Sequence, residues 1–267
     1  LFKDLAAKPL AARARVTGIG PRRAQIIVPG VAVMLEVLQR FQLPSLYYST
    51  AGVRDGIIAD LAARRVGAEE AVLNREQRRV VERMAVKFAV PLKHARQVAG
   101  FCEVLFDSLK PLHRLAPGWG RLLQAAAILY DTGHYISDTG HHKHAQYLVE
   151  NSDLPGFTDR EKLLISMMCR FHRKSMPTAR HTQFQALGPE DRRILLLLIV
   201  LLRLGDALNQ SKEQRTESIV CELKNGAVVV TVNGTEQIDL EIWASERVGE
   251  AFQQVYGRPL IIVRGRR

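Results

Sequence analysis

Four of the eight histidines of this chain fall within eleven positions, in the stretch LYDTGHYISDTGHHKHAQYLVE that begins at Leu129. They are His134, His141, His142 and His144. Imidazole nitrogens and carboxylate oxygens bind Mn, Fe, Ni or Zn, and such a metal lowers the pKa of a bound water that can attack a phosphoester. The stretch therefore indicates a metal site, the remains of one, or a helix start rich in imidazole.

Further candidate ligands lie on either side of this stretch. The order is His94 in LKHARQV, Asp131 in AAILYDTG, then His144 and His172, and finally Asp206 in LLRLGDALNQ. This order resembles the HD superfamily, in which a His, an adjacent His-Asp pair and a late Asp converge on a divalent metal inside a helical bundle. The residual ligand candidates are His94, Asp131, His144, His172 and Asp206.

Tyr130 stands where the pattern has the histidine of the adjacent pair. A phenol with an ordinary pKa of about 10 is a poor ligand near neutral pH. A tightly bound transition metal is therefore not expected at the HD-like site.

The HHKH run adds less to a metal site than its composition indicates. On a helix His142 and His144 are about 200° apart and point to opposite faces. We interpret His141 and His142 as a mixture of capping and solvated side chains. His144 is the better candidate, because Tyr147 and Leu148 at i+3 and i+4 place it beside the core-facing side.

The first 66 residues predict alternating strands and helices. RAQIIVPG predicts a short strand, VAVMLEVLQRF a helix, SLYYST a second strand, and GVRDGIIADLAARR a helix that begins after a glycine. Strand–helix alternation implies crossover connections and a buried sheet.

Residues 69 to 213 predict a bundle of five to seven helices. The segments are NREQRRVVERMAVKFA, LKHARQVAGFCEVLFDSL, GWGRLLQAAAILYD, HHKHAQYLVEN, DREKLLISMMCRFHRK and EDRRILLLLIVLLRLGDALNQS. Predicted N-caps are Asn74, Thr139, and Thr158 with Glu161 three residues later. The apolar run Ile194–Leu202 is too short to span a bilayer and predicts a buried core helix.

The last fifty residues predict a small α+β module. SIVCELKNGAVVVTV alternates on both sides of Asn225-Gly226, a signal for a hairpin with a type I′ turn. TEQIDLEIW predicts a third strand, ASERVGEAFQQVYG a helix and PLIIVR a final strand. The predicted fold class is multi-domain α+β.

Composition restricts the environment and the partners. Cys102, Cys169 and Cys221 are far apart and form no CxxC pair, which favours a reducing cytoplasm. There is no signal-peptide pattern, and the initial Leu suggests a piece of a longer protein. The net charge of +11 indicates an anionic partner, namely nucleic acid, anionic lipid or a polyphosphate-type substrate.

Three motifs in order resemble the exopolyphosphatase / guanosine pentaphosphate phosphohydrolase family. They are GIGPRRAQIIVPGVAVMLEVLQRF with YYSTAGVRDGIIADL, the run from AAILYDTG through HHKHAQYLVENSDLPGF to RFHRK, and LLRLGDALNQS before the small tail. The resemblance implies three regions: the end of an actin-like α/β subdomain at 1–68, a degenerate HD-like helical domain at 69–214, and the C-terminal α+β module at 215–267.

The resemblance also implies an activity and where it resides. Enzymes of that family cleave a terminal phosphoanhydride of polyphosphate or guanosine pentaphosphate with Mg²⁺, using an N-terminal actin-like half. No DxGGGS-type phosphate loop is present in this sequence, so no catalytic residue is assigned to it. The helical domain is implied to bind the anionic chain and to support a homodimer.

A polyanion groove needs Arg and Lys, with Arg giving bidentate contacts to oxygen. The candidates are Arg170, Arg173, Lys174, Lys143, Arg22 and Arg23. Two alternatives stay open at this point. One is an autonomous HD-type phosphohydrolase that uses His94, Asp131 and Asp206. The other is a nucleic-acid-binding module, which rests on charge alone, without a helix-turn-helix, RNA-recognition or zinc-finger signature.

Overall fold

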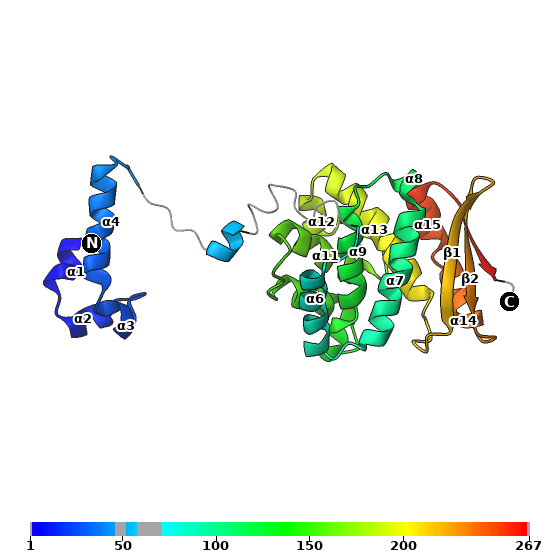
Figure 1. Cartoon of the computed structure of the whole chain (residues 1–267), viewed down its shortest axis with the longest axis horizontal. Helices are drawn as coiled ribbons and strands as arrows, with labels where there is room; N and C mark the ends of the chain where they lie inside the picture. Colours follow the sequence, from blue (N-terminus) through cyan, green and yellow to red (C-terminus); the bar gives the residue numbers. More distant parts are fainter. Residues whose placement is uncertain (1, 46–51, 58–70, 266–267) are drawn as a thin grey trace. The chain divides into compact units, whose positions relative to one another are not determined.

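The computed structural model describes residues 2–45, 52–57 and 71–265. The chain divides into two compact units, Leu1–Arg54 and Asp55–Arg267, which are described separately below (Figure 1).

The described part of the first unit is helical. It contains α1 (Phe2–Ala7), α2 (Leu10–Ala14), α3 (Gly20–Ala24) and α4 (Ile27–Arg40). The strand predicted for RAQIIVPG is therefore wrong. Its apolar residues continue the helical spacing of the next segment, and Pro29 lies in the first turn of α4, where a missing N–H costs nothing. The helix predicted for VAVMLEVLQRF is confirmed as the body of α4.

Two other predictions for this region are only partly testable. SLYYST lies outside the described residues apart from Ser45, and residues 53–57 of the next predicted helix are helical.

The second unit is built around a helical bundle. Its elements are α6 (Arg75–Lys87), α7 (Leu92–Ser108), α8 (Lys110–His113), α9 (Gly118–Leu129), the short 3₁₀ helix η1 (Thr132–Tyr135), α10 (His141–Glu150), α11 (Asp159–Phe171), α12 (Thr182–Ala186) and α13 (Pro189–Ala207). The six helices predicted in this region are confirmed as α6, α7, α9, α10, α11 and α13.

The helix caps divide into confirmed and wrong predictions. Asn74 and Thr158 each form a full capping box, with Gln77 and Glu161 respectively. Thr139 does not cap α10, because the N-cap residue is Gly140 and the helix start has no hydrogen bond from a capping side chain. A glycine in the left-handed region (φ 73°) lets the chain turn into α10 at that point.

The core of the bundle is formed by α9, packed against α6, α7, α11 and α13. Every residue of α9 from Gly120 to Leu129 is buried, as expected for a helix covered on all sides. The apolar run Ile194–Leu202 lies within α13 and is almost wholly buried, so the predicted core helix is confirmed. Among the described residues, no helix has both the length and the apolar content to cross a membrane.

The C-terminal module packs on this bundle through contacts of β1 with α7 and of α15 with α13. Strands β1 (Thr216–Lys224) and β2 (Ala227–Gly234) form the predicted antiparallel hairpin, with Asn225 and Gly226 both at positive φ. Strand β3 (Leu260–Arg264) pairs in parallel with β2 after a crossover through α14 (Asp239–Glu246) and α15 (Gly249–Tyr256).

The third strand predicted for TEQIDLEIW is wrong, because α14 occupies this segment. Ile238 is buried and Ile242, four residues on, is partly buried, whereas Leu240 between them is 42% exposed. This is helical rather than alternating spacing. Asp239 and Glu241 in the first turn also favour a helix start.

Candidate functional site

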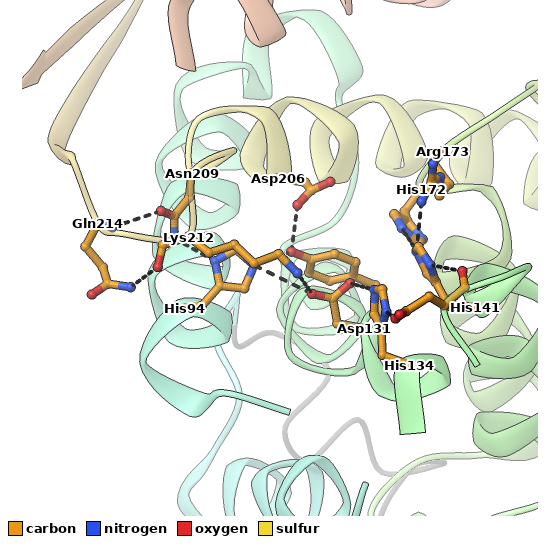
Figure 2. A network of polar contacts seen from close by, with 12 residues as sticks. His94, Asp131, His134, His141, His172, Arg173, Asp206, Asn209, Lys212 and Gln214 are labelled. Carbon is orange, nitrogen blue, oxygen red and sulfur yellow. Dashed lines mark hydrogen bonds and ion pairs between the residues drawn. The ribbon is translucent and has the colours of Figure 1, made fainter. Parts of the chain in front are cut away.

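The candidate site lies at one end of the bundle, where α9 ends and residues of several other segments approach it (Figure 2). Tyr130 and Asp131 follow α9 directly. His94 lies in the first turn of α7, Asp206 in the last turn of α13, and Lys212 in the loop after α13. The remaining groups are His134 in η1, His141 at the start of α10, and His172 at the end of α11.

Two glycines allow these segments to approach closely. A Cβ on Gly133 would lie 1.8 Å from the carbonyl oxygen of His141, so only glycine lets η1 rest against the start of α10. A Cβ on Gly205 would lie 2.6 Å from Sγ of Cys102, which brings α13 against α7 beside Asp206. These contacts place His134 next to His141, and Asp206 near His94.

Tyr130 connects His94 to Asp206 through a chain of hydrogen bonds, and we call these three residues the phenol-bridged set. Nδ2 of Asn209 donates to Nδ1 of His94 at 2.8 Å, so the proton of the neutral ring is on Nε2. Nε2 of His94 lies 2.7 Å from the Tyr130 hydroxyl, which in turn donates to Oδ1 of Asp206 at 2.7 Å. The phenol thus occupies the polar atoms that a metal would need.

Burial controls the protonation of this set. It lowers the pKa of His94 to about 4, with help from the positive charge of Lys212, so the ring is neutral at pH 7. Burial and the negative charge of Asp131 together raise the pKa of Asp206 to about 6. Burial and the charge of Asp206 also keep the Tyr130 phenol protonated by raising its pKa.

Asp131 is buried and contacts both His94 and His134. Nζ of Lys212 donates to its Oδ2 at 2.6 Å, and Nε2 of His94 is 3.8 Å from the same oxygen. Burial opposes ionisation, but the hydrogen bond with His134 and the Lys212 ammonium hold the pKa of Asp131 well below its usual range. Asp131 is therefore a carboxylate.

Asp131 also belongs to a second group, which it forms with His134 and His141 and which we call the imidazole cluster. One potential ligand atom of each lies within 4.8 Å of the others. Nε2 of His134 is 3.4 Å from Oδ1 of Asp131, and the rings of His134 and His141 stack with centroids 3.8 Å apart. Nε2 of His141 is 3.4 Å from Nε2 of the buried His172, which we include in the imidazole cluster.

The sequence did not single out His134, and our interpretation of His141 as capping or solvated is wrong, because His141 is only 3% exposed. His144 is half-buried on α10 outside the cluster, and Tyr147, expected beside the core, is 62% exposed. The signal for His134 and His141 was Gly133, which marks a close backbone approach.

The predicted polyanion ligands of the second unit gather near the same end of the bundle. The pKa of His142 falls to about 4 through partial burial and through the positive charges of Arg170, Arg173 and Lys143. Arg173, Lys174 and Lys143 are exposed, and Nη1 of Arg170 is buried without a partner.

Arg22 and Arg23 lie in α3 of the first unit, where Nη1 of Arg23 donates to the carbonyl oxygen of Gly18 at 3.3 Å.

The fold and the site thus define a helical-bundle protein with a buried histidine–aspartate site at one end of the bundle and exposed cations near it. The model of the Ppx/GppA phosphatase domain III matches residues 77–242, and the Ppx/GppA phosphatase family model matches residues 1–65. The chain belongs to the Ppx/GppA phosphatase family, as its motifs predicted.

Two curated relatives of this chain are named guanosine-5'-triphosphate,3'-diphosphate pyrophosphatase. The protein of Aeromonas hydrophila is 24% identical over 155 residues, which cover 58% of this chain and 30% of the relative. That of Vibrio atlanticus is 23% identical over 199 residues, covering 74% of this chain and 39% of the relative. The chain thus spans about a third of the length of the curated relatives it matches.

Proposed function

We propose that this chain is the polyanion-binding C-terminal region of an exopolyphosphatase-like hydrolase. It binds inorganic polyphosphate or guanosine pentaphosphate and supports a homodimer. Phosphoanhydride hydrolysis, with Mg²⁺, belongs to an N-terminal actin-like half of the same protein. Family membership and the names of the relatives support the phosphoanhydride class of substrate.

The observation that carries the proposal is the clustering of three cations at this end of the bundle: Nη1 of Arg173 lies 3.3 Å from Nε2 of His141, Lys143 lies two residues beyond His141 on α10, and Arg170 lies in the last turn of α11. Among the described residues, none of these three cations, nor the adjacent Lys174, forms an ion pair with a carboxylate. Uncompensated like charges on adjacent helices destabilise a protein. A bound phosphate chain, with about one negative charge per unit, would relieve that repulsion.

The phenol-bridged set argues against the alternative of an autonomous HD-type hydrolase. Both ring nitrogens of His94, the Tyr130 hydroxyl and Oδ1 of Asp206 already take part in hydrogen bonds within the protein. A metal at that position would have to displace the buried phenol of Tyr130.

The test is polyphosphate binding by fluorescence anisotropy at several salt concentrations. We expect the double variant Arg173→Ala/Lys174→Ala to bind about 10-fold or more weakly, because two charge-assisted contacts are lost. The matched control is Arg75→Ala/Arg79→Ala, which removes two exposed cations from α6. Equal losses of polyphosphate affinity in the two variants would show that binding depends only on net charge, and would contradict a defined binding site.

The homodimer is tested separately by analytical ultracentrifugation of the chain. A single species of about twice the 29.9 kDa chain mass is expected at micromolar concentration. A monomer at all concentrations would remove dimerisation from the proposal and leave polyanion binding unaffected.

A further inference from the structure

The imidazole cluster contains lone pairs that face one another without a proton between them. Nδ1 of His141 lies 3.1 Å from the carbonyl oxygen of Asp138, and Nδ1 of His172 lies 2.7 Å from that of Cys169. A carbonyl oxygen only accepts, so each Nδ1 carries the hydrogen, and each neutral ring presents a bare Nε2. These two Nε2 atoms are 3.4 Å apart.

This arrangement is unfavourable unless a cation lies between the two nitrogens. Both side chains are buried, at 3% and 5% exposure, so water does not compensate the repulsion freely. Nη1 of Arg173 reaches Nε2 of His141 at 3.3 Å and supplies one donor. Nε2 of His172 has no other partner among the described residues.

His134, on the other side of the cluster, has a carboxylate facing each of its ring nitrogens. Its Nδ1 lies 2.6 Å from Oδ1 of Asp138, and its Nε2 faces Oδ1 of Asp131 at 3.4 Å. The contact with Asp131 needs a proton on Nε2 or a metal ion in the place of that proton. An Nδ1 held by a carboxylate or a carbonyl is the second-shell arrangement that orients metal-binding histidines.

The separations fit a tetrahedral ion. With Zn–N and Zn–O bonds of about 2.0–2.1 Å, neighbouring ligand atoms of a tetrahedron lie about 3.3–3.4 Å apart. The pairs His141–His172 and His134–Asp131 both have this separation, 3.4 Å. Lys212 occupies Oδ2 of Asp131 and leaves Oδ1 for a ligand bond.

We propose that Asp131, His134 and His141, with His172 as the fourth neighbour, bind one transition-metal ion of the Zn²⁺ or Co²⁺ class. Three imidazoles and one carboxylate select such an ion over Mg²⁺, which prefers oxygen ligands. The site shares only Asp131 and His172 with the ligand set predicted from the sequence. Arg173, a proposed polyanion ligand, contacts His141 of this site, so polyphosphate binding is tested on the metal-free chain and failure of either proposal can be told apart.

The experiment is a titration of the chelator-treated chain with Co²⁺, followed by visible absorption, and with Zn²⁺ followed by metal analysis after gel filtration. We expect one equivalent to bind, with the visible bands of four-coordinate Co²⁺, and no comparable binding of Mg²⁺. Failure to retain Zn²⁺ or to develop these bands overturns the proposal.

Variants assign the ligands. His141→Gln and His172→Gln are each expected to weaken Co²⁺ binding. For His141→Gln we expect a loss of about 100-fold, since even the loss of a residue that only orients a ligand lowers metal affinity about 10- to 100-fold. The matched control is His144→Gln on the same helix, which is expected to change affinity less than 3-fold. An equal loss in the control overturns the assignment.

X-ray absorption of the zinc-loaded unmodified chain gives a test that does not depend on the folding of any variant. The proposal requires at least two imidazole ligands in the first shell, and a spectrum with oxygen ligands only contradicts it.

Discussion

The phenol-bridged set and the imidazole cluster lie on opposite sides of Asp131, yet they satisfy their polar groups in different ways. In the phenol-bridged set every donor has an acceptor, from Asn209 through His94 and Tyr130 to Asp206. In the imidazole cluster acceptors face acceptors, between His141 and His172. One substitution, the phenol of Tyr130 in place of an imidazole, accounts for the closed hydrogen-bond chain on its side.

The difference shows that one side of Asp131 has a closed hydrogen-bond chain, while on the other side two imidazole nitrogens face each other. A buried polar network that is fully satisfied is rigid and stable, whereas one with facing lone pairs needs a cation. The following experiments test this contrast, from the largest expected effect to the smallest.

Tyr130 is expected to be a main stabilising residue of the site. Tyr130→Ala should lower the free energy of unfolding by about 3–5 kcal/mol, because it leaves a cavity and two buried polar partners without a contact. Urea denaturation of the metal-free chain measures this. The control Tyr147→Ala, at a position that is 62% exposed, should change stability by about 0.5 kcal/mol or less. Similar losses in both variants would show that the bridge contributes little.

The buried histidines should make the metal-free chain acid-labile. The pKa of His94 falls from 6.5 in an unfolded chain to about 4, so the unfolded state binds its proton first. Stability is therefore present above pH 6.5 and is lost as pH falls toward 4, by about 3 kcal/mol for this residue. Urea titrations at several pH values in EDTA measure the decline.

Asp206 works in the opposite direction within the same pH window. Its pKa is raised from 3.8 to about 6, so its protonation favours the folded state as pH falls from 6 to 4. Asp206→Asn should therefore make the acid decline steeper than in the unmodified chain. An unchanged or shallower decline would contradict a raised pKa in the phenol-bridged set.

Tyr130→His should convert the phenol-bridged set into a second metal site. With the phenol removed, an imidazole at this position joins His94, Asp131 and Asp206, and the Co²⁺ stoichiometry is expected to rise from one to two. Tyr130→Phe is the matched control, because it also removes the hydroxyl but adds no ligand. A Co²⁺ stoichiometry that stays at one would show that the Tyr130 phenol is not what prevents metal binding in the phenol-bridged set.

Lys212 should weaken metal binding at the imidazole cluster through its charge on Asp131. Lys212→Met is expected to raise Co²⁺ affinity about 3- to 10-fold, a modest change because the lysine side chain is 47% exposed and screened by solvent. Lys87→Met, which removes an exposed cation from α6, serves as the control. A loss of affinity in Lys212→Met would instead indicate that the lysine mainly holds Asp131 in place.

Local sequence patterns were sufficient to predict most of the bundle and of the C-terminal hairpin. Asn74 and Thr158 initiate helices through contacts within four residues, and Asn225-Gly226 forms its turn through its own backbone preferences. RAQIIVPG and TEQIDLEIW were mispredicted because a short apolar run fits a strand or a helix turn equally well. Burial decides between them, as the unequal exposure of Leu240 and Ile242 shows.

The sequence by itself determined the family and the helical class of the central region. Only the tertiary structure decided which histidines meet. His134 and His141 are seven residues apart and come together because Gly133 rests on the backbone of α10, while His172 reaches them from the end of another helix. Such contacts depend on the packing of whole helices, which no local pattern of residues encodes.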